Sequence, residues 1–547
     1  MNLDERQIVW PPTMPGPWSG HPPVGTLQAV VPLLMADPAA EALTFEDGAS
    51  FTRGELLSAI RRFGGFLSER VEPGDRVLLG VSNRVEFLIA WLGILANGAV
   101  PVMVDPAMGP YEAGYIVSDS EPVAVVVEGR IATLLDDQTL APDVALIRVE
   151  GPEPHGLERY RSVDLPVDQF FLVHELATPA GINYTSGTTG PPKGCIQSHL
   201  QFSRYADVYL RLYPFRSSDV ILNLLQFHYG DALWMWIMAL RLNARYVSVR
   251  RFSVRRFWTL VTQFRVTTFF AIGAIPTLLL KGPCPSPIPS TLRFALQVAV
   301  PRKLHQELID RFGFPWIEVY GLSESGPVIC MPPAHAENYI DTGAIGIPAP
   351  EVEVKVVAEG SVLEGACTGE LFVRSPGVMI GYLNHPSATA EVLNEGWLRT
   401  GDMVRRDASG VYYFLGRIKS VIRRGGQNVA PAEVEAVLSL HPKVHEAAVI
   451  PVGDELMGEE IKAIVLMRAG QSFEPEALAR FCGEKLAAFK VPRYFEERIE
   501  PFPRTASMRI RKELLAENGV KGAGTAWDSR AFQAQVEPTR AGCERAR

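Results

Sequence analysis

Short apolar runs alternate with longer stretches of helical periodicity, and this alternation constrains the fold more than any other feature of the sequence. Residues 76–82, 124–128 and 267–272 have the length and the Val, Leu, Ile and Phe content of buried strands. Residues 54–69 and 85–97 carry apolar residues at helical spacing. Strands and helices that alternate in this way build packed layers, so we predict an α/β fold with largely buried strands.

The pattern changes from about residue 346 onward. Residues 351–357, 370–374 and 411–415 read as short strands separated by turns. This part predicts a β-rich subdomain at the end of a large N-terminal domain of α/β layers, which we place at residues 1–416.

A second change follows residue 416. Residues 431–440 and 474–489 have the pattern of helices, the first with proline at its start, and residues 446–450 that of a strand. We therefore predict a small α+β C-terminal domain at residues 417–517. Residues 518–547 lose periodicity and are rich in Gly, Ala and charge, which predicts a flexible tail.

Composition excludes several classes of protein. The chain has 547 residues, 47% hydrophobic and 21% charged, with a net charge of −8, so it is neither mainly disordered nor a general polyanion binder. The six cysteines are scattered, which disfavours a disulfide framework or a structural zinc site. The longest apolar run, 87–96, is too short to span a bilayer, and residues 1–23 lack the apolar core of a signal peptide. We expect a cytoplasmic protein.

The sharpest local motif is Tyr-Thr-Ser-Gly-Thr-Thr-Gly-Pro-Pro-Lys-Gly at residues 184–194. Its glycines allow backbone N–H groups to approach an anion closely, its hydroxyls add donors, and Lys193 adds a positive charge. No Ser or Thr follows the lysine, so the motif is not the P-loop of nucleotide triphosphatases. We interpret it as a cradle for phosphate.

Further motifs follow in a fixed order, at residues 227–228, 320–324, 369–371, 381–386, 397–402, 416–419 and 423–431. Together with the phosphate loop they resemble the adenylate-forming superfamily of acyl-CoA ligases, peptide-synthetase adenylation domains and luciferases. Residues 424–429 and 488–492 are most similar to the carnitine/crotonobetaine type of CoA ligase. The resemblance implies a carboxylic acid or its acyl adenylate as substrate, with ATP or AMP, CoA and Mg²⁺.

The resemblance also implies where the nucleotide binds. Tyr320 is expected against the adenine, Ser323 at the α-phosphate, and Asp402 with Arg417 at the ribose. Glu324 and Thr185 are the expected Mg²⁺ ligands, because hard oxygen donors suit that ion. The full set implied for nucleotide binding is Thr185, Ser186, Gly187, Thr188, Thr189, Gly190, Lys193, Tyr320, Ser323, Asp402, Arg417 and Asn428.

The resemblance places the acyl group near Phe227 and near Gly273, Ala274 and Gly321, and the small side chains of the last three leave room for a bulky hydrophobic group. By the same resemblance, His228 lines the opening between the acyl site and the thiol tunnel, although a lone histidine is often a core residue. We interpret Trp234 and Trp236 as core residues. Residues 296–300 replace the Gly-Gly-Ala stretch that is common beside the adenine.

In the family the C-terminal domain rotates about a hinge, which corresponds here to Lys419. One pose presents a lysine for adenylation, and the other brings Gly425 and Gly426 to the pantetheine tunnel for thioester formation. A plain turn between two strands also favours Gly-Gly. The residues with implied catalytic roles are His228, Glu324, Lys419, Gly425, Gly426 and Arg509.

The last family motif departs from its pattern. Residues 503–512 read Pro-Arg-Thr-Ala-Ser-Met-Arg-Ile-Arg-Lys, with Met508 in place of glycine and Arg509 in place of the catalytic lysine. We therefore hypothesise thioester formation from a supplied acyl adenylate and CoA with a defective adenylation step, which requires a separate adenylating enzyme. The alternatives are an ordinary two-step ATP-dependent ligase, an acyl-AMP ligase that loads a carrier protein, and a non-catalytic acyl-adenylate-binding protein.

Overall fold

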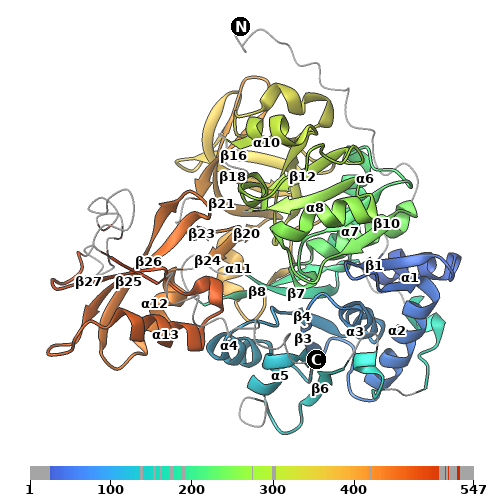
Figure 1. The fold of residues 1–547 in the computed structure, drawn as a ribbon. Helices are drawn as coiled ribbons and strands as arrows, with labels where there is room; N and C mark the ends of the chain where they lie inside the picture. Colours follow the sequence, from blue (N-terminus) through green and yellow to red (C-terminus); the bar gives the residue numbers. More distant parts are fainter. Residues whose placement is uncertain are drawn as a thin grey trace. The chain divides into compact units, whose positions relative to one another are not determined.

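The computed structural model describes residues 25–135, 140–151, 155–160, 163–171, 176–185, 191–273, 275–298, 304–417, 422–429, 431–503, 510, 512, 515 and 526–529. By their contacts these residues divide into two compact units (Figure 1). The first takes its described residues from 1–106, 116–185 and 193–418, and the second from 107–115, 186–192 and 419–547.

The larger sheet of the first unit has fifteen strands. Its parallel part joins β1, β10, β9, β11, β12 and β13, and pairing becomes antiparallel from β13 to β14 onward, earlier in the chain than residue 346. The strands are β1 Glu41–Phe45, β2 Ser50–Thr52, β9 Val220–Asn223, β10 Arg245–Ser248, β11 Thr268–Ile272, β12 Phe294–Val298, β13 Trp316–Leu322, β14 Gly326–Cys330, β15 Ala344–Pro348, β16 Glu353–Ala358, β17 Ser361–Leu363, β18 Cys367–Arg374, β20 Leu393–Asn394, β21 Trp397–Arg406 and β22 Tyr412–Arg417.

The second sheet of this unit has seven strands in the order β19-β8-β7-β4-β3-β5-β6. Its centre is parallel, whereas β7 pairs with β8 and β8 with β19 in antiparallel fashion. The strands are β3 Arg76–Gly80, β4 Val100–Met103, β5 Ala124–Glu128, β6 Ala145–Val149, β7 Pro179–Thr185, β8 Lys193–Ser198 and β19 Gly381–Tyr382.

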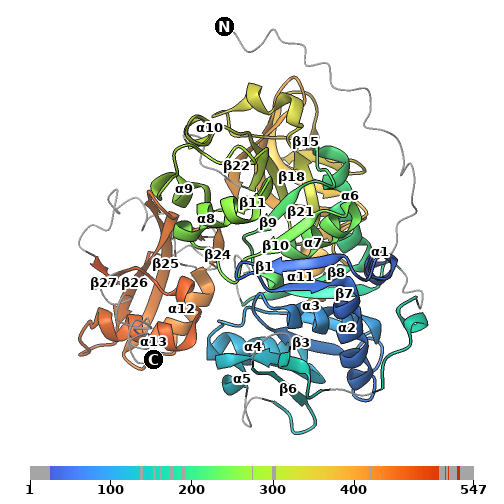
Figure 2. The same cartoon turned by 45° about the vertical axis from the view of Figure 1, so that its right-hand side comes forward.

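Helices flank both sheets, as Figure 2 shows from a second side. A capping box between Thr52 and Glu55 starts α2, one residue before the start that the sequence predicts. In α3 every residue is buried, because a helix that is apolar on all sides must be covered on all sides. The helices are α1 Thr26–Ala36, α2 Arg53–Leu67, α3 Val85–Ala96, α4 Pro110–Ser120, α5 Gly129–Leu134, α6 His199–Leu212, α7 Asp231–Leu242, α8 Val254–Phe264, α9 Ile275–Lys281, α10 His305–Phe312 and α11 Pro386–Val392.

The second unit contains a six-stranded sheet in the order β24-β23-β26-β27-β28, with β25 paired to β26. Its elements are β23 Ile422–Arg424, β24 Gln427–Val429, α12 Pro431–Ser439, β25 Val444–Asp454, β26 Gly458–Met467, α13 Pro475–Lys485, β27 Tyr494–Arg498 and β28 Trp527–Asp528. A separate apolar core lies between this sheet and its helices. The predicted α/β class, with a small α+β C-terminal part, is confirmed.

The prediction of a flexible tail from residue 518 is wrong at residues 526–529. Trp527 and Asp528 form an antiparallel strand against Phe495 and Tyr494 of β27. Trp527 packs against Phe495 with the ring centres 6.0 Å apart, and Ser529 has no exposed surface. Periodicity cannot reveal a two-residue strand, since its partner lies about thirty residues earlier and supplies the ladder.

This strand allows a stability test. We expect Trp527→Ala to lower the free energy of unfolding by about 1–3 kcal/mol, less than the ~3–5 kcal/mol of a fully buried tryptophan, because the side chain is only half-buried. Urea denaturation followed by far-UV circular dichroism measures the change. Substitution of Val163, which is 85% exposed, by Ala is the control and should have no measurable effect. An unchanged midpoint in Trp527→Ala would contradict a structural role for the strand.

Candidate active site

Several predicted site residues lie outside the described residues. These are Ser186, Gly187, Thr188, Thr189, Gly190, Ala274, Lys419 and Arg509, together with the side chains of Arg417 and Asn428. The other predicted site residues are among those that the structure describes.

Tyr320 and Asp402 come together from two different strands of the larger sheet. Tyr320 lies near the end of β13, Asp402 lies in β21, and the Tyr320 hydroxyl donates a hydrogen bond of 2.7 Å to Asp402 Oδ2. Asp402 has no exposed surface, and its strand register places it directly opposite Arg417 of β22. Eighty-two residues separate the tyrosine from the aspartate, so only the sheet brings this phenol and carboxylate into contact.

The turn after β13 is held by its neighbours. The Ser323 carbonyl oxygen accepts hydrogen bonds from Gln197 Nε2 at 3.0 Å and from Gln201 Nε2 at 2.8 Å. The Glu324 carbonyl oxygen accepts one from Met379 N at 2.7 Å. These bonds hold the backbone from which the Ser323 and Glu324 side chains project.

Tyr382 contacts two of the predicted site residues, and our sequence analysis did not single it out. Its hydroxyl donates to Glu324 Oε1 at 3.0 Å, and Lys193 Nζ lies 5.2 Å from the centre of its ring. The tyrosine thus joins the lysine of the phosphate motif to the predicted metal ligand. The 381–386 motif that carries Tyr382 was part of the resemblance. No local pattern in the sequence, however, indicates that Tyr382 contacts Lys193 and Glu324.

The ends of the phosphate loop are paired across two antiparallel strands. Thr185 ends β7, Lys193 begins β8, and the two are direct partners in the ladder. The two ends of the predicted anion cradle are therefore held side by side, while residues 186–190 lie outside the described residues.

His228 lies in the short 3-10 helix Phe227–Tyr229 and is buried. Burial lowers the pKa of its imidazole, against a smaller opposing effect of Asp105. Neither ring nitrogen has a hydrogen-bond partner among the described residues. Buried polar atoms of core residues normally have a hydrogen-bond partner. A neutral, buried imidazole without one therefore fits a ligand-binding residue better than a core residue.

The residues predicted for the acyl pocket are packed more tightly than expected. Phe227 has no exposed surface, and its ring centre lies 5.5 Å from that of Phe87. A Cβ atom at Gly321 would lie 2.6 Å from the carbonyl oxygen of Gly326, so strand packing alone requires glycine there. Gly273 has a φ angle of +59°, in the left-handed region that favours glycine over other residues.

The glycine turn of the second unit is a hairpin between β23 and β24. Gly425 and Gly426 have φ angles of +57° and +86°, which L-residues rarely adopt. Gly425 N donates to the Met457 carbonyl oxygen at 2.9 Å. Beside the turn, the buried Arg424 donates to the Phe489 carbonyl oxygen at 2.7 Å and pairs with Glu460. These contacts hold the β23 end of the hairpin against β26 and the segment that carries Phe489.

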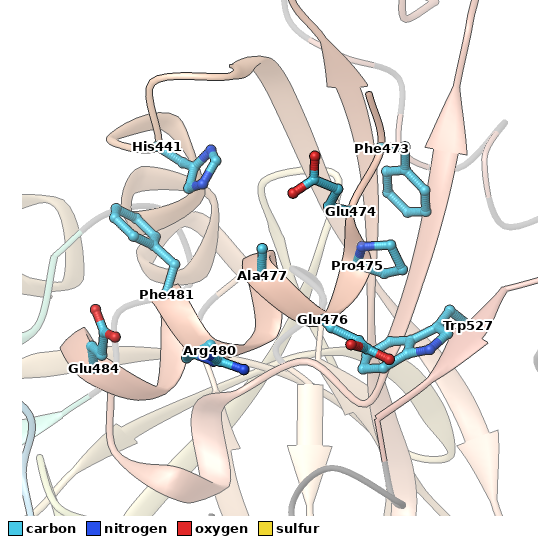
Figure 3. Close-up of a pocket in the computed structure, with 10 residues that line it drawn as sticks. All are labelled: His441, Phe473, Glu474, Pro475, Glu476, Ala477, Arg480, Phe481, Glu484 and Trp527. Atoms are coloured by element: carbon cyan, nitrogen blue, oxygen red, sulfur yellow. The ribbon is translucent and has the colours of Figure 1, made fainter. Parts of the chain in front are cut away.

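The second unit also has a recess of about 580 Å³ that contains none of the predicted site residues (Figure 3). Its wall combines aromatic rings with carboxylates from α13 and the segment before it. The lining residues are His441, Phe473, Glu474, Pro475, Glu476, Ala477, Arg480, Phe481, Glu484 and Trp527.

Two features are absent from the described residues. These residues contain no group of three or more His, Cys, Asp or Glu side chains placed to hold a metal ion. In the same part of the chain, no helix is long and apolar enough to cross a membrane.

Family comparison decides the class of this protein. Residues 34–383 match the model of the AMP-binding enzyme family, and residues 433–509 match its C-terminal domain. The chain belongs to the AMP-binding enzyme family. The resemblance to adenylate-forming acyl-CoA ligases is thereby confirmed, and the protein is an enzyme of the acid–thiol ligase class. ATP or AMP and CoA are the cofactors of this class.

Individual relatives agree with this assignment. The chain is 30% identical over 498 residues to a crotonobetaine/carnitine–CoA ligase of Citrobacter koseri, covering 87% of this chain and 95% of the relative. Its fold is similar to o-succinylbenzoate CoA synthetase from Bacillus subtilis, with a TM-score of 0.78, 25% identity and coverage of 90% and 98%. It is also similar to the amide bond synthetase McbA from Marinactinospora thermotolerans, with a TM-score of 0.78, 26% identity and coverage of 90% and 99%.

Proposed function

We propose that this AMP-binding enzyme forms an acyl-CoA thioester from an acyl adenylate and CoA, and that it is defective in making the adenylate itself. The observation that carries the proposal is the sequence at residues 508–509, Met-Arg in place of the family's Gly-Lys. The acid would reach the enzyme already activated by a separate adenylating enzyme.

The physical argument concerns two anions that must meet. In adenylation a carboxylate attacks the α-phosphorus of ATP, and a compact ammonium group bridges the attacking and phosphoryl oxygens. The guanidinium of Arg509 keeps the positive charge but is longer, planar and forked. Such a site tolerates displacements of only about 0.5 Å, so the charge would be misplaced.

Thioester formation makes different demands, and the described residues fit them. The adenylate must be held by its ribose and phosphate. For this purpose the Tyr320–Asp402 pair offers a buried carboxylate, and the Ser323–Glu324 turn offers a hydroxyl and a second carboxylate on a backbone held by Gln197. The acceptor thiol must pass close to backbone, for which the glycine hairpin of the second unit is suited. Neither demand involves residue 509.

Mg²⁺ would be needed only where ATP is used. Glu324 and Thr185 supply one carboxylate and one hydroxyl, which suits an ion that retains several waters and binds nucleotide phosphates. When bound, the ion would neutralise charge on those phosphates. Glu324 is already oriented by the Tyr382 hydroxyl.

Two parallel assays test the proposal. The purified protein is incubated with acid, ATP and Mg²⁺, and separately with synthetic acyl adenylate and CoA. We expect rapid thioester formation in the second assay and little acid-dependent pyrophosphate release in the first. Pyrophosphate release at ordinary ligase rates would leave a two-step ligase. If the protein binds the adenylate but forms no thioester, it is a non-catalytic binding protein. If a carrier protein accepts the acyl group in preference to CoA, the enzyme is an acyl-AMP ligase that loads a carrier protein.

The glycine hairpin gives a prediction for the thioester step. Gly426→Val places a β-branched side chain at a φ of +86°, where L-residues are strained by about 1–3 kcal/mol, and adds bulk where CoA is proposed to pass. We expect thioester formation from acyl adenylate to fall at least about tenfold, while adenylate affinity stays the same. Gly410→Val, at a φ of +84° in a turn of the first unit, is the matched control for strain alone and should retain turnover. Equal losses in both variants would contradict the role of the hairpin.

A further inference from the structure

Arg493, the residue before β27, is a buried cation that pairs with three carboxylates of the second unit. Its guanidinium lies 2.6 Å from Asp454, 3.6 Å from Glu460 and 3.4 Å from Asp528. A buried ion network is often no more stabilising than apolar packing of the same volume, but each of its charge-assisted hydrogen bonds has a preferred direction. The network therefore fixes the positions of its members more than it stabilises the fold.

One route from Arg493 to the glycine hairpin passes through Glu460 of β26. Glu460 is buried, its Oε2 lies 2.7 Å from Arg424 Nε, and Arg424 Nη2 donates to its Oε1 at 3.3 Å. Arg424 directly precedes Gly425 and is the ladder partner of Gly458. One carboxylate thus contacts both arginines, so its orientation toward Arg424 depends on Arg493.

A second route passes through Asp454, the last residue of β25. Its Oδ2 pairs with Arg493, and its Oδ1 accepts hydrogen bonds from Leu456 N at 2.9 Å and Met457 N at 2.8 Å. Burial raises the pKa of this carboxyl, but the two backbone N–H groups and the arginine lower it by more, so it is ionised at neutral pH. The Met457 carbonyl oxygen accepts the hydrogen bond from Gly425 N at 2.9 Å. The first glycine of the hairpin therefore contacts a turn that Arg493 helps to hold.

Arg493 is itself held by β28, a strand that lies beyond the end of the family match at residue 509. In addition to the ion pair with Asp528, Ser529 N donates to the Arg493 carbonyl oxygen at 2.7 Å. Ser529 Oγ donates to the Pro492 carbonyl oxygen at 3.1 Å, and Asp528 is the ladder partner of Tyr494. Both the side chain and the backbone of Arg493 are thus held by residues that the family model does not include.

We infer that β28 serves thioester formation in this enzyme, with Asp528 and Arg493 as positioning residues for the glycine hairpin. Gly425 and Gly426 have positive φ angles and no side chains that could pack, so the shape of their turn depends on its neighbours. The two routes from Arg493 supply these neighbours. The inference rests on the proposed function, since it needs the hairpin to guide the acceptor thiol.

Steady-state kinetics of the full-length protein with synthetic acyl adenylate and CoA test the inference. Asp528→Asn removes one charge from the network but keeps the shape of the side chain and the backbone ladder. We expect it to raise the KM for CoA by at least about fivefold, because small displacements caused far from the chemistry can cost up to about 10²-fold. The KM for acyl adenylate should stay the same. Arg493→Lys keeps the charge but loses the planar fork, so its effect on CoA should be equal or larger.

Glu496→Gln is the matched control. Glu496 of β27 pairs with the buried Lys462 of the same sheet, and its side chain is 35% exposed, against 28% for Asp528. Loss of this ion pair should leave the KM for CoA unchanged. A merely structural role of Asp528 predicts instead that Asp528→Asn lowers the thermal unfolding midpoint without a change in either KM.

The double variant Asp528→Asn/Arg493→Lys shows whether the two residues act together. If Asp528 acts through Arg493, the KM for CoA of the double variant should exceed that of Arg493→Lys by no more than about twofold. Multiplied effects, an unchanged KM for CoA in Asp528→Asn, or an equal change in Glu496→Gln would overturn the inference and leave thioester formation in place. A wild type that forms no thioester would overturn the proposed function, and the inference with it.

Hydrogen exchange of the hairpin gives a readout that needs no turnover. Local opening exposes backbone amides, so a less firmly held turn exchanges faster. In Asp528→Asn we expect the amides of residues 422–429 to exchange at least about threefold faster than in the wild type, whereas Glu496→Gln should leave them unchanged. Equal exchange in Asp528→Asn and the wild type would show that β28 does not hold the hairpin and would contradict the inference.

Discussion

Replacement of Arg509 by lysine should raise acid-dependent pyrophosphate release by about 10²–10³-fold. One preorganised charge contact in a transition state is typically worth about 3–4 kcal/mol, and the lysine ammonium can bridge the carboxylate and the phosphoryl oxygens where the forked guanidinium cannot. A coupled pyrophosphate assay with a panel of carboxylic acids measures the gain. Thioester formation from supplied acyl adenylate should stay unchanged, since it does not use this residue.

Met508 provides the control for this experiment. A residue with a Cβ atom restricts the dihedral angles that glycine would allow, so the loop itself can limit adenylation. Met508→Gly alone should therefore have a small effect, and Met508→Gly with Arg509→Lys should equal or exceed the single lysine variant. Brisk adenylation by the natural protein, or no gain in either lysine variant, would refute the proposed defect.

Replacement of Asp402 by alanine should weaken acyl adenylate binding by about 10²-fold. The aspartate has no exposed surface, and we propose that it accepts hydrogen bonds from the two ribose hydroxyls. Hydrogen bonds to a charged acceptor contribute about 1.5–3 kcal/mol each, so the loss of two bonds at the lower end of this range predicts an effect of this size. The KM for acyl adenylate and the affinity of a non-hydrolysable analogue both report it.

The partner of Asp402 allows a finer comparison. Tyr320→Phe removes the hydroxyl that donates to Asp402 at 2.7 Å but keeps the carboxylate, so its effect should remain below about tenfold. Circular dichroism of both variants checks that the β13 and β21 strands are intact. An Asp402→Ala protein that binds adenylate as well as the wild type would remove this residue from the nucleotide site.

Local signals in the chain were sufficient for several of the elements. The helix expected at 85–97 is α3, Val85–Ala96, and the strand expected at 124–128 is β5, Ala124–Glu128. The helix expected at 474–489 is shorter, since α13 ends at Lys485. The interpretation of Trp236 as a core residue is also confirmed, because its side chain is fully buried and its Nε1 donates to the Ala42 carbonyl oxygen.

The sequence by itself determined the class of fold, the phosphate motif and the departure at Arg509, because periodicity and motif spacing depend on neighbours along the chain. Only the tertiary structure decided that Tyr382 joins Lys193 to Glu324. Those contacts join β8, β19 and the turn after β13, which are far apart in sequence. The hydrophobic effect that packs these elements together is non-directional. The local sequence of one element therefore does not show which polar side chains of another element it will contact.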